Sequence, residues 1–337
     1  MVIAVPTYAT NSERQAYLDA AEIAGIECVR LINESTAIAL TYGFFRRNDL
    51  NTKRPRVVVF VDLGHSKLTV TFASFIPGKT KIIMTHSNRN LGARKIDYQL
   101  FEKFGEQFNK DYGCDPRKNA RCRLRMLDAI EKMRKLLTAN KETDINCEAL
   151  MEDEDFHKHF TRAELEELMD PFMRDFAQCL KEALAKSGLT WDHIDYVELV
   201  GEATRIPIVQ ESIKQIFGKK EVSRTLNSQD CIARGCALQA AMLSPNFQVA
   251  NFQIEEFNQL PISISYKFKN SDKVITKELF GIGANFPSTK NICFENKLGG
   301  CDLLVHYSDK ALLMAGLPNQ IAQYEISEAK PDRPKAI

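Results

Sequence analysis

The sequence Val57-Val-Val-Phe-Val-Asp-Leu-Gly-His-Ser66 is an apolar run that ends in a short polar turn. Runs of β-branched and aromatic residues continue at 68–76 and 81–85, with Pro77 and Gly78 between them. This alternation predicts an antiparallel meander of three strands. The turn at 62–66 would then lie at a sheet edge, where backbone N–H groups and one carboxylate can hold phosphate and magnesium. An ordinary Asp-x-Gly hairpin is the alternative interpretation.

Helical patterns lie on both sides of these strands. Asn11 or Ser12 is expected to cap a helix that runs to Gly25, and a strand is predicted at 27–32. The small apolar face of that helix would consist of Ala16, Ala20, Ala21 and Ala24. From 95 to 140 the period is helical again, with one apolar stripe of Leu100, Phe104 and Phe108 and another of Leu124, Leu127 and Ile130.

A capping box marks the next helix. Thr161-x-x-Glu164 forms the box, and Phe160 and Leu165 are placed as its hydrophobic staple. A strand at 194–200, a turn at 201–205 and a helix ending at 217–218 follow, and 229–243 predicts one more helix. Alternating segments after residue 245 predict a β-rich module, with a domain boundary near 245–255.

The composition limits the classes of function. With 337 residues, 44% of them hydrophobic, the chain is long enough for two or three units. Its 45 basic and 44 acidic residues give no general argument for a nucleic-acid or membrane partner. Nine scattered cysteines without a Cys-x-x-Cys pair suit reduced thiols in the cytosol. No apolar run approaches the roughly 20 residues of a membrane span, and residues 1–10 lack the order of a signal peptide.

One predicted helix carries groups that suit a nucleoside. A carboxylate, two cations and a hydroxyl are spaced to share one face, where they could grip a ribose and a purine ring. These residues are Glu131, Arg134, Lys135 and Thr138. A solvated stripe with pairing of glutamate and lysine is the alternative for such a helix.

The turn at Gly201 lies between a strand and a helix, an arrangement that delivers phosphate to helix N–H groups. The Glu202 carboxylate would repel phosphate there unless a metal ion or a cation intervenes.

His157 and His159 lie in a charged stretch without further ligands, so they are expected at the surface and no metal site is assigned. No Ser/His/Asp or Cys/His set offers nucleophilic catalysis.

Together, these segments resemble the seventy-kilodalton heat-shock chaperone superfamily over nearly the whole chain. The matching motifs are Val2-Ile-Ala-Val-Pro6, Arg14-Gln-Ala16, Ala24-Gly25, Ile32-Asn-Glu-Ser-Thr-Ala37, Asp62-Leu-Gly64, Leu91-Gly92, the helix at 131–138, Leu199-Val-Gly201 and Thr204-Arg-Ile-Pro207. The resemblance implies an α/β chain with an actin-like ATPase fold, partial in lobe I and complete in lobe II, followed by a partial β-sandwich substrate-binding-like module.

The implied boundaries place the end of lobe I at 1–52 and lobe II at 53–245, with its upper part at about 92–169. A linker would cover 246–256 and the β-rich module 257–337. The first phosphate loop and the lysine of lobe I lie upstream of these segments in the family, and the helical lid lies downstream. The chain therefore resembles an interior fragment.

The loop after Asp62 points to one branch of the superfamily. Standard chaperones carry three glycines, a threonine and a second aspartate here, whereas this chain reads Asp62-Leu-Gly-His-Ser-Lys-Leu-Thr69. Gly-His-Ser resembles the large, hundred-and-ten-kilodalton branch, as do Ser35 in place of a proline and Ser244-Pro245 followed by the segment at 247–252. That branch is known mainly as a nucleotide-exchange factor and a holdase.

The resemblance also implies roles for single residues. Asp62 would orient magnesium or the attacking water, and Glu34, with Pro6, would couple the nucleotide to the substrate module; Asp62 and Glu34 are the catalytic candidates. The residues that would bind ATP or ADP, with Mg²⁺, are Gly64, His65, Ser66, Lys67, Gly92, Glu131, Arg134, Lys135, Thr138, Gly201, Glu202 and Arg205. Thr69 stands in place of a carboxylate, and Glu202 and Ala93 replace glycines, so hydrolysis is expected to be weak or absent and nucleotide affinity reduced.

The resemblance thus implies an ATP-binding co-chaperone of the stress response, in the cytoplasm or the nucleus. It would promote nucleotide exchange on a seventy-kilodalton chaperone and hold unfolded polypeptides. Three alternatives stay open: an ATP-hydrolysing folding chaperone, a nucleotide-independent holdase or nonfunctional truncated product, and a sugar kinase with the same core. The β-rich segments after 245 favour a chaperone over the kinase.

Overall fold

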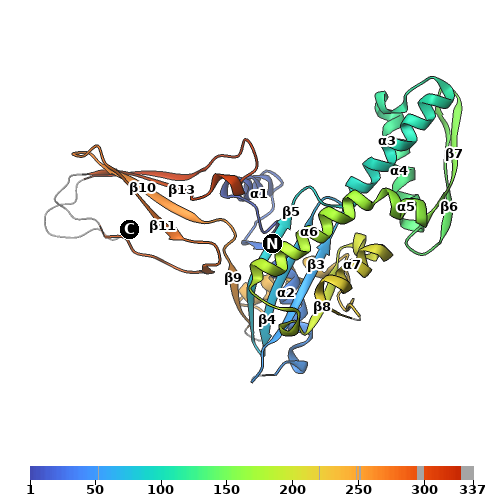
Figure 1. The fold of residues 1–337 in the computed structure, drawn as a ribbon. Coiled ribbons are helices and arrows are strands. Elements are labelled where there is room, and N and C mark those ends of the chain that lie inside the picture. The colour runs from blue at the N-terminus through green and yellow to red at the C-terminus, as the bar shows by residue number, and fades with distance from the viewer. Residues whose placement is uncertain (52, 220, 248, 250–251, 294–299, 328–337) are drawn as a thin grey trace. The chain divides into compact units, whose positions relative to one another are not determined.

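The computed structural model describes residues 1–51, 53–219, 221–247, 249, 252–293 and 300–327 (Figure 1). These residues divide into two compact units. Unit 1 comprises Met1–Arg56, Phe72–Thr85 and the described residues from Asp230 onward, and unit 2 comprises Val57–Thr71 and His86–Gln229. Parts of the predicted linker and the end of the predicted β-rich module, at 248, 250–251 and 328–337, lie outside the described residues. The predicted domain boundaries stay predictions.

Unit 1 begins with a parallel pair of strands, β1 (Val2–Val5) and β2 (Arg30–Asn33), joined through helix α1 (Asn11–Ile23). The helix is capped by Thr10 and not by Asn11 or Ser12, because the Thr10 side chain accepts from the Glu13 N–H. Thr10 forms a capping box with Glu13, which satisfies two amides at the helix start.

The predicted apolar face of α1 is wrong. Ala21 is buried, but Ala16, Ala20 and Ala24 are exposed. The helix packs through a face that also contains Arg14 and Leu18, which are half-buried. Arg14, Leu18 and Ala21 recur at four- and three-residue intervals, and the Arg14 side chain reaches Asn33 at the end of β2.

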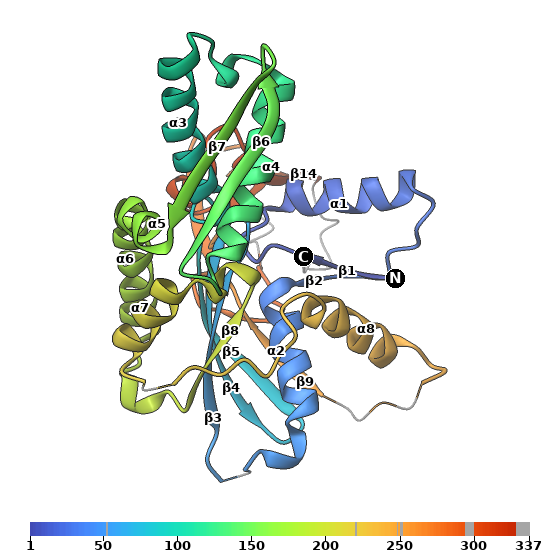
Figure 2. The ribbon, with the colours of Figure 1, turned by 90° about the vertical axis from the view of Figure 1, so that its right-hand side faces the viewer.

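Helix α2 (Glu34–Phe45) packs closely against helix α8 (Cys231–Leu243) (Figure 2). A Cβ atom on Gly235 of α8 would lie 2.2 Å from the Ala37 carbonyl oxygen on α2. Thr41 Oγ1 donates to the Cys231 carbonyl at 2.7 Å and reinforces the contact. The predicted helix at 229–243 is confirmed, and its small residues permit this close approach.

The three predicted strands are confirmed as β3 (Arg56–Leu63), β4 (Leu68–Ile76) and β5 (Lys79–Asn88). They belong to a larger sheet with the strand order β12-β9-β5-β4-β3-β8. Strand β8 (Tyr196–Val200) runs parallel to β3, and β9 (Gln253–Phe257) runs parallel to β5. Three strands that are remote in sequence, β8, β9 and β12, therefore extend the meander into a mixed sheet.

Unit 2 carries a helical part in which α3 (Ala93–Tyr112) and α4 (Ala120–Leu136) pack beside the hairpin of β6 (Glu142–Met151) and β7 (Glu154–Thr161) (Figure 1). A short 3₁₀ turn at Pro116–Lys118 joins the two helices. The predicted stripe of Leu100, Phe104 and Phe108 is fully buried.

The second predicted stripe is partly wrong. Leu124 is 68% exposed, whereas Ile130 is buried as predicted, and α4 also buries Cys122, Met126 and Met133. These residues recur at four-, four- and three-residue intervals, so thiol and thioether side chains complete the apolar face.

The capping box at Thr161 and Glu164 is confirmed at the start of α5 (Arg162–Leu168), and the staple residues Phe160 and Leu165 are buried. Helix α6 (Asp170–Ser187) and a 3₁₀ turn at Trp191–His193 lead to β8. A second 3₁₀ turn at Glu202–Arg205 precedes α7 (Pro207–Phe217), which ends before Gly218 as predicted.

The β-rich part of unit 1 is a four-stranded antiparallel sheet with the order β11-β10-β13-β14. Its strands are β10 (Ile262–Phe268), β11 (Val274–Phe280), β13 (Cys301–Tyr307) and β14 (Gln320–Ile326), and β12 (Asn285–Phe286) pairs with β9. Short 3₁₀ turns occur at Arg47–Asp49 and Lys310–Leu312.

In the described part of the chain, no helix is long and apolar enough to cross a membrane.

Replacement of Gly235 by alanine is expected to destabilise unit 1, because the new Cβ would meet the Ala37 carbonyl at 2.2 Å. Overpacking of this kind costs about 1–3 kcal/mol. Urea denaturation followed by circular dichroism measures the loss. The exposed Ala237→Ser on the same helix is the control and should change stability by less than about 1 kcal/mol. Equal midpoints for the two variants would contradict the contact.

Candidate functional site

The turn between β3 and β4 is held by backbone hydrogen bonds. The Gly64 N–H donates to the Lys67 carbonyl at 3.1 Å and closes the turn. The first amides of α3, those of Ala93 and Arg94, donate to the carbonyls of Gly64 and His65 at 3.0 and 2.9 Å. These helix amides therefore fix the turn and are not available to phosphate.

Two glycines permit other backbone segments to approach this turn. A Cβ atom on Gly92 would lie 2.4 Å from the His65 carbonyl oxygen. A Cβ atom on Gly201, whose φ is +79°, would lie 2.4 Å from the Leu63 carbonyl oxygen and 2.7 Å from Asp62 Oδ1. The predicted site residues Asp62, Gly64, His65, Gly92 and Gly201 are therefore brought together in unit 2.

Asp62 lies at the carboxyl end of β3, where its register partner on the parallel strand β8 is Val200. Its side chain is 9% exposed. Gly201 follows Val200 directly, so Asp62 and the Gly201 turn occupy the ends of neighbouring parallel strands. Ligands of open α/β sheets bind at such strand ends.

The turn after Gly201 contains an exposed ion pair. Glu202 Oε2 lies 2.7 Å from Arg205 Nε, and Thr204 Oγ1 donates to the Gly201 carbonyl at 2.7 Å. Arg205 thus supplies the cation that an anion next to Glu202 requires. The pair resolves the charge conflict that the sequence indicates at position 202.

Helix α4 presents a second ion pair, between Glu131 Oε1 and Lys135 Nζ at 2.7 Å. The hydrogen bond from Lys135 lowers the pKa of Glu131, and the nearby charges of Arg134 and His65 add to the effect. Thr138 follows the helix and donates to the Lys135 carbonyl at 2.7 Å.

Arg134 does not share the solvent-facing surface of Glu131 and Lys135. It is 4% exposed, and its Nε and Nη2 donate to the two carboxylate oxygens of Asp97 on α3 at 2.5 and 3.0 Å. This bidentate pair ties α4 to α3. Sequence reasoning missed Asp97, because its partner lies 37 residues away and no local spacing reveals it.

The turn's remaining polar residues differ in exposure. His65 is exposed, and Ser66 and Lys67 are half-buried. Thr69, the second residue of β4, is buried, and its Oγ1 accepts from Ser87 Oγ at 3.3 Å. Thr69 therefore presents a neutral hydroxyl, already engaged by Ser87, and its predicted effect on metal binding stays a prediction.

Glu34 belongs to unit 1, where it is the first residue of α2. Ser35 beside it is buried and its Oγ lies 2.8 Å from Thr7 Oγ1. The role predicted for Glu34 stays a prediction, as do the binding roles of the residues in unit 2.

The two histidines of the charged stretch lie on β7, where His157 and His159 are exposed. His159 Nδ1 lies 2.9 Å from Asp144 Oδ1, and this hydrogen bond raises the pKa of His159. Among the residues that the structure describes, no group of three or more His, Cys, Asp or Glu side chains could hold a metal ion.

Comparison with known proteins gives one family. The model of the Hsp70 protein family matches residues 1–336. The chain is 38% identical, over 97% of its length, to a heat shock protein homolog of Lachancea kluyveri. It is 37% identical over 96% of its length to "Heat shock 70 kDa protein 16" of Arabidopsis thaliana, and 38% identical over 92% to the "97 kDa heat shock protein" of Strongylocentrotus purpuratus.

The chain spans about half the length of these relatives or less. It covers 47% of the Lachancea protein, 42% of the Arabidopsis protein and 35% of the Strongylocentrotus protein.

Replacement of Arg134 by methionine is expected to destabilise unit 2 strongly, because the Asp97 carboxylate would stay buried without its cation. Breaking a buried pair in this way costs about 3–5 kcal/mol. Urea denaturation, followed by fluorescence of the single tryptophan in the same unit, Trp191, measures the change. The matched control is Lys132→Met, which breaks an exposed pair with Asp128 on the same helix and should cost less than about 1 kcal/mol. Equal losses would refute the structural role of the buried pair.

Proposed function

The chain belongs to the Hsp70 protein family, and we propose that it is an ATP-binding co-chaperone that promotes nucleotide exchange on a seventy-kilodalton chaperone. The Gly64-His-Ser66 turn supports this assignment within the family through its resemblance to the hundred-and-ten-kilodalton branch. The observation that carries the proposal is the environment of Thr69.

Thr69 is 6% exposed and its hydroxyl accepts a hydrogen bond from Ser87. It brings no negative charge to a divalent cation, whereas a carboxylate at the same position would. Because metal ions neutralise charge that develops in phosphoryl transfer, a poorer metal site disfavours hydrolysis more than binding. A nucleotide that is bound but turned over slowly acts as a conformational ligand, which suits a protein that regulates another chaperone.

The described residues of unit 2 fit an adenine nucleotide in their chemistry. Asp62 supplies a carboxylate for Mg²⁺ at the strand ends, where it lies beside the Gly201 turn. Lys135 and Glu131 offer a cation for a base and acceptors for ribose hydroxyls once they separate from each other. Bound magnesium would neutralise charge on the phosphates.

A nucleotide-independent holdase is the second candidate, favoured by the β-rich part of unit 1. Its described residues include Leu312, Met314 and Tyr324, which are 44%, 50% and 55% exposed. Exposed apolar side chains of this kind can receive apolar segments of unfolded polypeptides.

An ATP-hydrolysing folding chaperone is a weaker candidate, because Thr69 disfavours hydrolysis. All nine cysteines are free, which supports a reducing compartment such as the cytoplasm or the nucleus.

The exchange activity is tested with a standard seventy-kilodalton chaperone loaded with fluorescent ADP. Equimolar addition of the chain should accelerate ADP release roughly tenfold, which corresponds to a barrier lower by about 1.4 kcal/mol. Stopped-flow fluorescence measures the rate, with the heat-denatured chain as control. Unchanged ADP release would remove the exchange role, and suppression of aggregation alongside it would favour the holdase.

Nucleotide binding by the chain itself is tested with Gly201→Ala. The added Cβ would meet the Leu63 carbonyl and Asp62 Oδ1, so the turn must move, and affinity for fluorescent ATP should fall at least about tenfold. Gly188→Ala is the matched control, because Gly188 also has a positive φ, of +67°, but has open space around it. Equal nucleotide affinities for the two variants would argue against a site at Asp62 and Gly201.

A further inference from the structure

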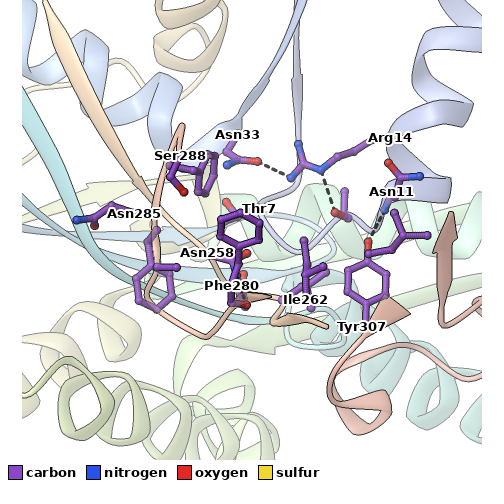
Figure 3. A pocket seen from close by; sticks show the side chains of 17 residues that line it. Thr7, Asn11, Arg14, Asn33, Asn258, Ile262, Phe280, Asn285, Ser288 and Tyr307 are labelled. Carbon is purple, nitrogen blue, oxygen red and sulfur yellow. Dashed lines mark hydrogen bonds between the residues drawn. The ribbon is translucent and has the colours of Figure 1, made fainter. Parts of the chain in front are cut away.

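Unit 1 contains a cavity of about 400 Å³ that the proposed function does not use (Figure 3). Its walls come from the start of α1, the end of β2, the segment from β9 to β10, the segment around β12, and strands β13 and β14. The volume is within the range of small-molecule sites in proteins. The cavity therefore has room for one small ligand.

The walls are mainly apolar. Six half-buried apolar side chains line the cavity: Phe257, Leu260, Ile262, Phe280, Phe286 and Ile321. Because each keeps part of its surface exposed in unit 1, an apolar body placed among them would remove more apolar area from water. Aromatic and aliphatic walls of this kind are typical of binding sites for small organic molecules.

Arg14 is the one charged residue among those that line the cavity. Its Nε donates to the Ala9 carbonyl at 3.0 Å and its Nη2 donates to Asn33 Oδ1 at 2.6 Å (Figure 3). Nη1 has no acceptor within the described part of the chain. Nε and Nη2 are thus engaged within the chain, whereas the N–H groups of Nη1 can still donate to a ligand.

The charges near Arg14 do not balance its burial fully. Burial lowers the pKa of the Arg14 guanidinium, although Glu256, Tyr307 and Glu13 act in the opposite direction. Glu256 is held on the far side of Asn33, whose Nδ2 donates to the Glu256 carboxylate. An added anion at the cavity would therefore improve the electrostatic environment of Arg14.

We propose that this cavity binds a small molecule with an apolar body and a single carboxylate. A neutral apolar ligand would cover the walls but leave Arg14 further from water without a new partner, and an ammonium ligand would be repelled by it. Phosphate or sulfate alone would contact Arg14 but leave the apolar walls uncovered. A monocarboxylate with an alkyl or aryl body satisfies both parts of the site. The inference is independent of the proposed exchange function.

The ligand class is tested by calorimetric titration of the whole 337-residue chain with octanoate, octanol and octylammonium. Octanoate is expected to bind about tenfold or more tightly than octanol, as a charge-assisted hydrogen bond would give, and octylammonium most weakly. In Arg14→Gln the affinity for octanoate should fall to that for octanol. Arg30→Gln, an exposed arginine on β2 that does not line the cavity, is the control and should keep the preference.

The location is tested by a variant that fills the cavity without removing a buried contact. Ser288 is exposed and lines the cavity, whereas the exposed Thr289 next to it does not. Ser288→Trp should weaken octanoate and octanol binding at least about tenfold, and Thr289→Trp should leave both unchanged. This comparison holds even where Arg14→Gln impairs folding.

Three results would overturn the proposal. Equal affinity of the parent chain for octanoate and octanol would remove the role of Arg14 in recognition. Equal binding by Ser288→Trp and Thr289→Trp would locate the ligand elsewhere. Binding of an apolar peptide amide at this cavity, without binding of octanoate, would make it a polypeptide-binding surface.

Discussion

The close backbone contacts around residues 64–67 are the constraint on which the candidate site depends. Gly92 and Gly201 lie so near the turn that neither position has room for a Cβ atom. The amides of Ala93 and Arg94 then hold the turn through its carbonyls. As a result, α3 sets the position of His65 and Ser66, and the end of β8 confines Asp62 and Leu63, before any ligand arrives.

The charged groups near this turn divide into fixed and adjustable pairs. Arg134 and Asp97 are buried and bidentate, so they fix the packing of α4 on α3. The pairs Glu131–Lys135 and Glu202–Arg205 are at least partly exposed, and such pairs contribute little to stability. They can therefore exchange their partners for those of a ligand at small cost, while the helices that carry them stay in place.

Local patterns in the sequence predicted the local structure well. The capping box at Thr161 and the strand at 57–61 are confirmed, because each depends on neighbours within a few residues. Two of the failures concern partners that are remote in sequence. The local spacing predicts Arg134 at the surface, because its partner Asp97 lies on another helix. Helix α1 packs through Arg14, because Asn33, which Arg14 contacts, lies at the end of β2. For the candidate site, the association of Asp62 with Gly201 was predictable only through the family resemblance, since it depends on the pairing of β3 with β8.

Asn33 occupies a position where one planar amide serves two partners at once. Its oxygen accepts from Arg14 and its nitrogen donates to Glu256, so the two ends of the amide are not interchangeable. Aspartate at this position would place a second negative charge against Glu256, and an aliphatic residue would leave a guanidinium and a carboxylate without their shared partner. Substitutions at 14, 33 and 256 are therefore coupled, and among homologous chains these three positions should change together or not at all.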